Sequence, residues 1–244
     1  MADILRVEGL TKRYGAFEAV ADLSFAVAER EVLGLLGRNG AGKSTTIKLL
    51  CNLIRPTAGQ AWLAGQPILG VRGAEHRRGL GAMVEAPRFY PQLSGRRNLE
   101  LLARIRGVDG ARVQEMLETV GLAARARERF DRYSMGMKQR LGLAAVFLHR
   151  PGLIILDEPT SGLDPVGRQQ IHDLIRALSR DLGVSLLVCS HHFSEVETLC
   201  GRALVLDHGR RVLDQSLAGP EGIAAVKAKF QELTAELNER RESA

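Results

Sequence analysis

The chain has 244 residues, enough for one large α/β domain with a buried core. Its 45% hydrophobic and 25% charged residues are ordinary for a soluble globular protein. No apolar run is long enough to cross a membrane, and the N-terminus, Met1-Ala2-Asp3, lacks the basic and apolar regions of a signal peptide. We therefore expect a soluble chain that neither spans a membrane nor is secreted.

Cysteine usage and charge distribution narrow the class further. The cysteines Cys51, Cys189 and Cys200 lie in apolar surroundings without a C-x-x-C pair, and are expected to be reduced core residues of a cytosolic protein. The net charge of +6 falls in one segment, because 96–150 holds twelve Lys and Arg against six Asp and Glu. Such a segment suits nucleic acid, an anionic membrane surface or a well-solvated helical face, and the solvated face is the default.

The first part of the chain reads as strands that lead to a glycine-rich loop. Residues 4–7 and 19–27 are predicted strands, with turn chemistry at Tyr14-Gly15 between them. The apolar run 32–36 is a further strand, and a helix is expected from Ser44 to Leu50. The loop between them consists of Gly37, Arg38, Asn39, Gly40, Ala41, Gly42, Lys43, Ser44 and Thr45.

A strand, a glycine-rich turn and a helix N-terminus in this order form a phosphate-binding loop. Glycines adopt positive φ and let the backbone approach an anion closely. Successive N–H groups then converge on phosphate oxygens, helped by the positive end of the following helix. Lys43 supplies a mobile positive charge to the outer phosphates, and Ser44 a hydroxyl to Mg²⁺. All nine loop residues are therefore predicted to bind a nucleotide.

The rest of the chain alternates between strands and helices, with one interruption. Residues 60–64 read as a short strand and 65–80 as irregular, after which about 92–150 are predicted to be an inserted helical subdomain. Strands return at 153–156, 184–188 and 203–206. Asp164 followed by Pro165 marks the start of a helix between them. This alternation predicts an α/β fold with a parallel sheet covered on both faces.

The tail, 220–244, is expected to be helical. Its apolar residues fall at heptad a and d spacing over only about two heptads, short of what a coiled coil needs. Packing on its own domain and pairing with another chain remain equally open. The residues are Ile223, Val226, Phe230, Leu233 and Leu237.

Two strands end in side chains that could act on a bound nucleotide. The run 153–156 is followed by Asp157 and Glu158, and ligands of parallel sheets sit beyond the carboxyl ends of the strands. Asp157 is therefore expected to reach Mg²⁺, and Glu158 to polarise a water for attack on the γ-phosphorus. His191 ends the next strand at the same edge, where it could bind a γ-phosphate oxygen and hold the attacking water.

This ordered series of motifs resembles the nucleotide-binding subunit of an ATP-binding cassette (ABC) transporter over about residues 3–218. In that family the phosphate loop precedes a glutamine-bearing loop, a signature resembling Leu-Ser-Gly-Gly-Gln, the Asp-Glu strand, a Leu-Asp turn and a switch histidine. Here the signature is Tyr133-Ser134-Met135-Gly136-Met137-Lys138-Gln139-Arg140, and the Leu-Asp turn is Ser161-Gly162-Leu163-Asp164-Pro165. The switch histidine corresponds to His191, and Tyr14 to the aromatic residue on which adenine stacks.

The resemblance implies a P-loop NTPase (RecA-like) core with an N-terminal antiparallel β subdomain and the inserted helical subdomain, together spanning 3–219. It also implies that two subunits sandwich two ATP molecules head to tail. Each site would join the phosphate loop of one chain to Ser134, Met135, Gly136 and Met137 of the other, with Asp164 in the contact between them. Mg²⁺ would be bound near Ser44, Asp157 and the glutamine-loop residue.

Two departures from the family pattern concern this site. Met135 and Met137 stand where the family has Gly and Gln, although Ser134 and Gly136 remain. The glutamine-loop position is Glu85, which adds a negative charge where the family usually has a neutral amide. Both variants resemble subunits of peptide-antibiotic exporters, including the bacitracin and lantibiotic self-protection systems.

The expected function is that of an ATPase subunit, using ATP and Mg²⁺, that drives a separate membrane-spanning permease. It would form a homodimer, or a heterodimer with a related ATPase, at the cytoplasmic face of the cell membrane. The alternative is a soluble ABC ATPase acting on ribosomes or nucleic acid. Such proteins usually carry two cassettes or a long coiled-coil insertion, which this chain lacks, so a nucleic-acid partner is not expected.

Overall fold

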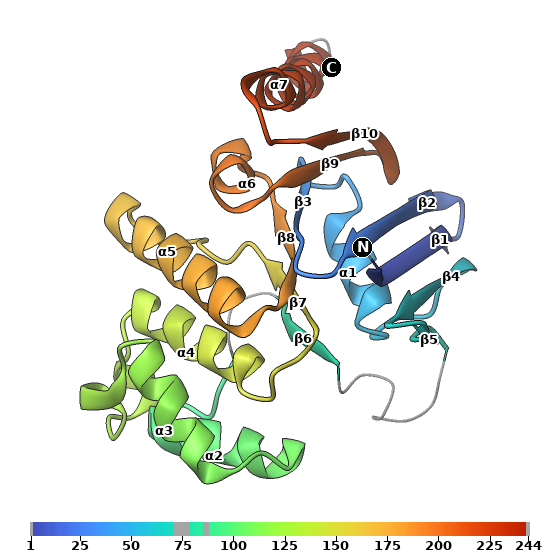
Figure 1. Ribbon diagram of the computed structural model, residues 1–244. Helices are drawn as coiled ribbons and strands as arrows, with labels where there is room; N and C mark the ends of the chain where they lie inside the picture. The colour runs from blue at the N-terminus through green and yellow to red at the C-terminus, as the bar shows by residue number, and fades with distance from the viewer. Residues whose placement is uncertain (1, 71–78, 85–87, 243–244) are drawn as a thin grey trace.

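A six-stranded sheet forms the centre of the computed structural model, which describes residues 2–70, 79–84 and 88–242. The strand order is β10-β9-β3-β8-β7-β6 (Figure 1). Neighbouring strands run parallel except for β10, which is antiparallel to β9. The strands are β3 (Val32–Gly37), β6 (Leu80–Met83), β7 (Leu153–Asp157), β8 (Ser185–Ser190), β9 (Arg202–Asp207) and β10 (Arg210–Ser216).

A second, antiparallel sheet lies beside the first, with the order β2-β1-β4-β5 (Figure 1). Its strands are β1 (Asp3–Tyr14), β2 (Phe17–Ala28), β4 (Ala58–Leu63) and β5 (Gln66–Pro67). The expected combination of a parallel α/β core with an N-terminal antiparallel β subdomain is thereby confirmed.

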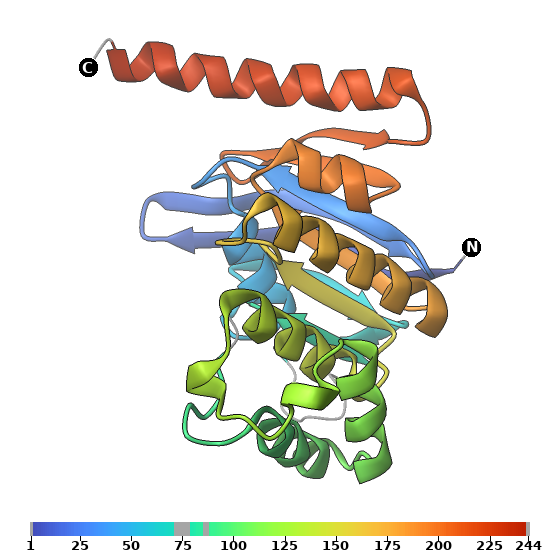
Figure 2. The same ribbon diagram turned by 90° about the vertical axis from the view of Figure 1, so that its left-hand side faces the viewer.

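Helices cover the parallel sheet on both faces. Helix α1 (Lys43–Leu50) packs between the two sheets, whereas α4 (Met135–Phe147), α5 (Pro165–Leu182) and α6 (Phe193–Leu199) pack on the other face. A block beside α4 contains α2 (Gly95–Arg106), α3 (Gly110–Thr119) and the 3₁₀ turns η2 (Ala123–Arg125) and η3 (Phe130–Arg132) (Figure 2). Among the described residues, no helix is long and apolar enough to cross a membrane.

Side chains of the central strands alternate between two cores, as burial on both faces requires. In β7, Leu153 and Ile155 pack towards α1 and the antiparallel sheet. Ile154 and Leu156 pack towards α4, α5 and α6. All four side chains are fully buried. This two-sided burial is why β7 reads as an unbroken apolar run, and it holds in place the polar residues that follow the strand.

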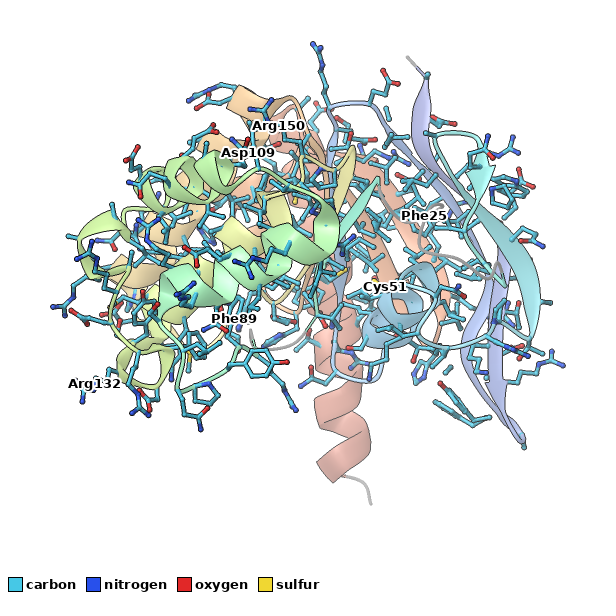
Figure 3. All side chains as sticks on the ribbon, turned by 90° about the horizontal axis from the view of Figure 1, so that it is seen from below. Phe25, Cys51, Phe89, Asp109, Arg132 and Arg150 are labelled. Atoms are coloured by element: carbon cyan, nitrogen blue, oxygen red, sulfur yellow. The ribbon has the colours of Figure 1, made fainter. Side chains whose placement is uncertain are left out.

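The helical block has a core of its own. The rings of Phe89 and Phe130 meet edge to face with centroids 5.1 Å apart, and Phe130 also lies beside Tyr133. Ser94 and Asp109 cap α2 and α3 by accepting hydrogen bonds from backbone N–H groups in the first turns. Figure 3 shows Phe89 and Asp109 on the side of the molecule away from the antiparallel sheet.

Part of the positive charge of this block is balanced locally. Three exposed arginines pair with partly exposed acids two or three residues away. Such pairs contribute little stability and support the default interpretation of a solvated helical surface. The pairs are Arg97–Glu100, Arg125–Glu128 and Arg129–Asp131.

The tail helix α7 (Pro220–Glu242) packs on its own domain. Val226 and Leu233 are buried, and Ile223 and Phe230 pack against the same core. The helix contacts β9, β10 and α6, and Figure 2 shows it lying across the top of the molecule. Of the two alternatives that the heptad spacing left open, packing within the chain is the one that the described residues show.

Three strands differ from the sequence-based expectation. The two-residue strand β5 lies inside 65–80, the segment expected to be irregular. β6 lies in and just beyond the segment expected to be irregular, because four residues are too few for a periodicity to emerge. β10 was not predicted at all. It is one of the two edge strands of the six-stranded sheet, and its largely exposed sequence RRVLDQS lacks the apolar alternation of a half-buried strand.

Gly34 in β3 provides a test of how the sheet packs on α6. A methyl group at this position would lie 2.4 Å from Cγ1 of Val196 and 3.1 Å from Sγ of Cys200. Gly34→Ala is therefore expected to lower the free energy of unfolding by about 1–3 kcal/mol, measured by urea titration. Gly201→Ala is the matched control, because a methyl group there meets no atom within 4 Å.

A double-mutant cycle with Val196→Ala separates this clash from other effects. Removing the Val196 methyl groups makes room for the new one, so the double variant should lose less stability than the sum of the two single variants. Strict additivity would contradict the packing of β3 against α6.

Candidate functional site

The glycine-rich loop connects β3 to α1 and is held from two sides. Gly42, the residue before α1, has φ of 102°. A Cβ atom there would lie 2.6 Å from the carbonyl oxygen of Ala19 in β2, so only glycine fits. On the other side, the N–H of Gly209, in the turn between β9 and β10, donates to the carbonyl of Ala41 over 3.0 Å. These contacts fix the loop against both sheets.

Lys43 begins α1 inside the loop and is only 6% exposed. Its ammonium donates to the carbonyl oxygens of Gly37, at 2.6 Å, and Arg38, at 3.2 Å. Burial lowers the pKa of Lys43, although the nearby Glu158, Cys189 and Asp157 act in the opposite direction. The cation is thus held at the point where the N–H groups of the first turn of α1 also face outwards, an arrangement suited to phosphate.

The acidic residues follow β7 as expected. Asp157 is the last residue of the strand and is 7% exposed. Glu158 has φ of 48°, a left-handed conformation that is uncommon for glutamate and is a form of local strain. Its N–H donates to the carbonyl oxygen of Cys189 in β8 over 2.9 Å. The backbone turn is therefore pinned to the neighbouring strand.

Glu158 and His191 meet across the carboxyl ends of β7 and β8. Oε1 of Glu158 accepts a hydrogen bond from the backbone N–H of His191 over 2.9 Å, and lies 2.6 Å from Nδ1 of the same residue. An ionised carboxylate can only accept, so in that state Nδ1 carries the hydrogen. The predicted convergence of these two side chains at one edge of the sheet is present in the structure.

One cavity of about 570 Å³ collects most of the predicted site residues. Lys43, Asp157, Glu158 and His191 all line it. So do Arg38, Asn39, Gly40, Gly42, Ser44, Thr45 and Met135. The remaining described candidates, which are Tyr14, Gly37, Ala41, Ser134, Gly136, Met137 and Asp164, are not among its lining residues. Glu85 lies outside the described residues.

The side chains available for a metal ion fit Mg²⁺. The hydroxyl of Ser44 and the carboxylate of Asp157 both line the cavity, and they are the hard oxygen donors that this ion prefers. Within the described ranges there is no group of three or more His, Cys, Asp and Glu residues that could hold a metal alone. An ion bound by two protein oxygens and by phosphate would need no such group.

The signature residues begin α4. Ser134 is the N-cap, and its Oγ accepts a hydrogen bond from the N–H of Met137 over 3.3 Å. Ser134 is exposed, Met135 is 49% exposed, and a Cβ atom built on Gly136 meets nothing within 4 Å. Asp164 caps α5 in the same way, by accepting from the N–H of Gly167 over 2.7 Å. The Asp164 cap was expected from the sequence, whereas the Ser134 cap was not predicted.

Several residues of this site were not predicted from the sequence. Gln139 of α4 is buried, and its amide donates to the carbonyl oxygen of Pro159 over 2.6 Å, which ties the signature helix to the residue after Glu158. Phe17 lines the cavity, whereas Tyr14, its partner across the β1–β2 turn, lies with its ring centroid 4.9 Å from the ammonium of Lys12. An aromatic residue directly after the turn was the signal that could have identified Phe17.

Comparison with known proteins agrees with this arrangement. The ABC transporter family profile matches residues 20–161. The chain is 41% identical to an uncharacterized ABC transporter ATP-binding protein, YhcH of Bacillus subtilis, over 87% of this chain and 70% of that protein. It is 40% identical to the bacitracin transport ATP-binding protein BcrA of Bacillus licheniformis, over 86% of this chain and 69% of that protein.

Solved structures show the same fold. An ATP-binding subunit of an ABC transporter superposes with a TM-score of 0.81 at 28% identity, over 93% of this chain and 99% of that one. A dimeric ATP-binding cassette in a post-hydrolysis state, bound to ADP and Pi, superposes with a TM-score of 0.77 at 23% identity, over 88% of this chain and 99% of that one. The chain belongs to the ABC transporter ATP-binding family and is an ATPase subunit of a transporter.

Proposed function

We propose that this subunit hydrolyses ATP in the cavity between the glycine-rich loop and the ends of β7 and β8, with Glu158 as general base and His191 as its partner. The observation that carries this assignment is the hydrogen-bonded contact between the Glu158 carboxylate and His191 on the wall that Lys43 and Ser44 also line. This one wall therefore supplies a base for the attacking water, a cation for the phosphates and a hydroxyl for the metal ion.

Each side chain has a separate part in the proposed reaction. Glu158 takes a proton from water as the water oxygen bonds to the γ-phosphorus, and the bond from that phosphorus to the β–γ bridging oxygen breaks to release ADP. Lys43 balances charge on the outer phosphates. With Nδ1 bonded to Glu158, His191 can donate to a phosphate oxygen through Nε2 only as the charged imidazolium.

Ser44 and Asp157 would hold Mg²⁺, which when bound neutralises charge on the β- and γ-phosphates. Glu85 is proposed to lie close to this ion, as the position of the family's glutamine loop implies. The remaining loop residues, 37–42 and 45, would bind the phosphates through their backbone N–H groups.

A second copy of this chain, or a related ATPase, is proposed to complete each site. The support is the exposure of Ser134 and the open space at Gly136, at the N-terminus of α4. Because Oγ of Ser134 accepts the capping bond, its hydroxyl hydrogen remains available to a γ-phosphate oxygen of the facing subunit. Met135 and Met137 would lie on the same surface, and Asp164 near it.

The permease partner is proposed to dock beside α2. The ring of Phe89 packs against Phe130 and the core of the helical block, so it contributes little to an exposed docking surface. Exposed apolar residues on α2 and just before it include Tyr90 (65%), Ile105 (78%) and Leu101 (36%). Leu101 and Ile105 are one turn apart on α2 and suit a short helix from a membrane protein.

The cargo is proposed to be a peptide antibiotic or a related compound, exported from the cytoplasm. The support is the similarity to bacitracin transport ATP-binding proteins of Bacillus licheniformis and Enterococcus faecalis. The subunit would then lie at the cytoplasmic face of the cell membrane. A soluble ABC ATPase acting on ribosomes or nucleic acid is the less favoured alternative, since most of the chain is similar to ATP-binding proteins of transporters.

Replacing Phe17 by Ala tests how the adenine base of ATP is bound. Base stacking on an aromatic ring contributes about 1–3 kcal/mol, so Phe17→Ala should weaken ATP binding by that amount in equilibrium fluorescence titrations. Tyr14→Ala should have an effect of the same size if Tyr14 provides the predicted stacking surface. Inorganic triphosphate, which lacks a base, serves as the matched ligand. Equal weakening for both ligands would show that Phe17 supports the loop instead.

Replacing Glu158 by Gln tests the proposed base and the partner together. The amide cannot accept a proton from water, so hydrolysis should fall by about 10²–10⁴-fold while MgATP binding is retained. With ATP and Mg²⁺ the variant should accumulate as a dimer in light-scattering measurements. Purified from solubilised membranes, this dimer should carry a membrane-spanning chain, whose sequence would identify the permease.

The same purification distinguishes the alternatives. The wild-type chain with ADP is the control and should remain monomeric. A trapped dimer that arrives with ribosomes or nucleic acid instead would favour the soluble ABC ATPase. Unchanged hydrolysis in Glu158→Gln would overturn the assignment of the base.

A further inference from the structure

A buried polar cluster lies directly behind the wall of the nucleotide cavity. Thr160, His172 and Glu195 are 4%, 5% and 2% exposed. Oγ1 of Thr160 donates to Oε1 of Glu195 over 2.6 Å, and Nε2 of His172 lies 3.4 Å from the same oxygen. None of the three lines the cavity, so contact with the nucleotide does not explain why they are polar.

The cluster joins the three segments that carry the proposed catalytic and contact residues. Thr160 lies two residues after Glu158, in the turn that leads towards Asp164. Glu195 lies four residues after His191, in the first turn of α6. His172 is on α5, two turns after its cap. One carboxylate therefore bonds a residue near the base to the helix that follows the switch histidine.

Burial of this carboxylate carries a free-energy cost that the hydrogen bonds must offset. Burial raises the pKa of Glu195, but hydrogen bonds from His172, Ser190 and Thr160, together with the His172 charge, lower it by more. The group thus remains ionised at neutral pH and acts as an acceptor for both neighbours. An apolar side chain could fill the same volume without this cost, which indicates that the polar contacts serve positioning.

The backbone between Glu158 and Thr160 is held at each residue. Glu158 donates to the carbonyl of Cys189, the carbonyl of Pro159 accepts from Gln139, and Thr160 donates to Glu195. Glu158 needs this support, because its φ of 48° is a strained conformation that persists only where its surroundings enforce it. Among these three contacts, only that of Thr160 is made with α6, the helix that follows His191.

We propose that Glu195 is a positioning residue for hydrolysis. Through its contacts with Thr160 and His172 it holds the segment Glu158–Thr160 in register with His191, so that the base points at the attacking water. The inference rests on the proposed roles of Glu158 and His191, and adds a requirement to them. ATP binding, which depends on the glycine-rich loop, does not require the cluster, whereas the hydrolytic step does.

Thr160→Val removes the hydroxyl from the cluster while preserving the shape of the side chain. We expect kcat for ATP hydrolysis by the full chain to fall by about tenfold or more, since small misplacement of a catalytic group has effects of this size. KM and the dissociation constant for ATP should change by less than about twofold, because the interaction is needed only for the chemical step. Thr160→Ser restores the hydroxyl and should recover most of kcat.

Two further variants keep this test decisive. Glu195→Gln retains the volume but removes the charge, and should show the same loss of kcat with ATP affinity retained. If the Thr160→Val protein fails to fold, the Glu195→Gln variant serves as the test of the proposal. Ser179→Ala is the matched control, because it deletes another buried hydroxyl, on the same helix as His172, that donates to the carbonyl of Val184 over 2.8 Å. Its kcat should equal that of the wild type.

The outcomes separate this inference from the proposed catalytic assignment. If Glu158→Gln abolishes hydrolysis but Thr160→Val and Glu195→Gln hydrolyse ATP at the wild-type rate, Glu195 has no positioning role. A parallel loss of ATP binding and kcat in those two variants, or failure of Thr160→Ser to recover activity, would show a merely structural role. If Glu158→Gln itself remains active, the assignment of the base fails first.

Discussion

The alignment of β7 with β8 is the constraint on which the candidate site depends. Asp157 pairs with Cys189 in the parallel register. This register brings together Glu158 and His191, the residues that directly follow β7 and β8. There the N–H of Glu158 bonds to the Cys189 carbonyl, and the Glu158 carboxylate accepts from the backbone of His191. A shift of one residue would turn these side chains to the other face of the sheet. Burial of both strands on both faces makes such a shift costly, so the cores of the domain fix the geometry of the site.

Features coded by contiguous residues could be predicted from the sequence. The loop from Gly37 to Thr45 follows from its glycines and from the apolar run before it, and α5 begins at Pro165 after the Asp164 cap as expected. The meeting of Glu158 with His191 also followed, although they are far apart in the chain. The general rule that parallel strands present their carboxyl ends at one edge was sufficient to predict it.

Contacts between side chains from different elements could not be predicted in this way. Gln139 reaches Pro159 because α4 packs against the sheet close to the end of β7. A single sequence carries no signal for how close these two elements lie. The pairing of Thr160 with Glu195 is of the same kind. Polar edge strands such as β10 escape for another reason, since their side chains need not alternate when neither face is deeply buried. Long-range packing, which no local pattern encodes, decides both of these side-chain contacts.

The same packing explains why one chain carries both a phosphate-binding wall and a signature surface, although the two belong to different nucleotide sites in the proposed dimer. The phosphate-binding wall is formed where α1 and the central strands meet, while Ser134 stands on the exposed start of α4. Gln139 lies on that same helix, one turn beyond Ser134, and bonds to the segment that follows Glu158. On the proposed arrangement, a γ-phosphate that draws Ser134 of a facing subunit towards it would therefore also act on α4 of that subunit. Through Gln139, the force would reach the base of the second site. Binding at one site and hydrolysis at the other would then be coupled by a helix and one hydrogen bond. A permease docked beside α2, as proposed, would experience the same movement of α4.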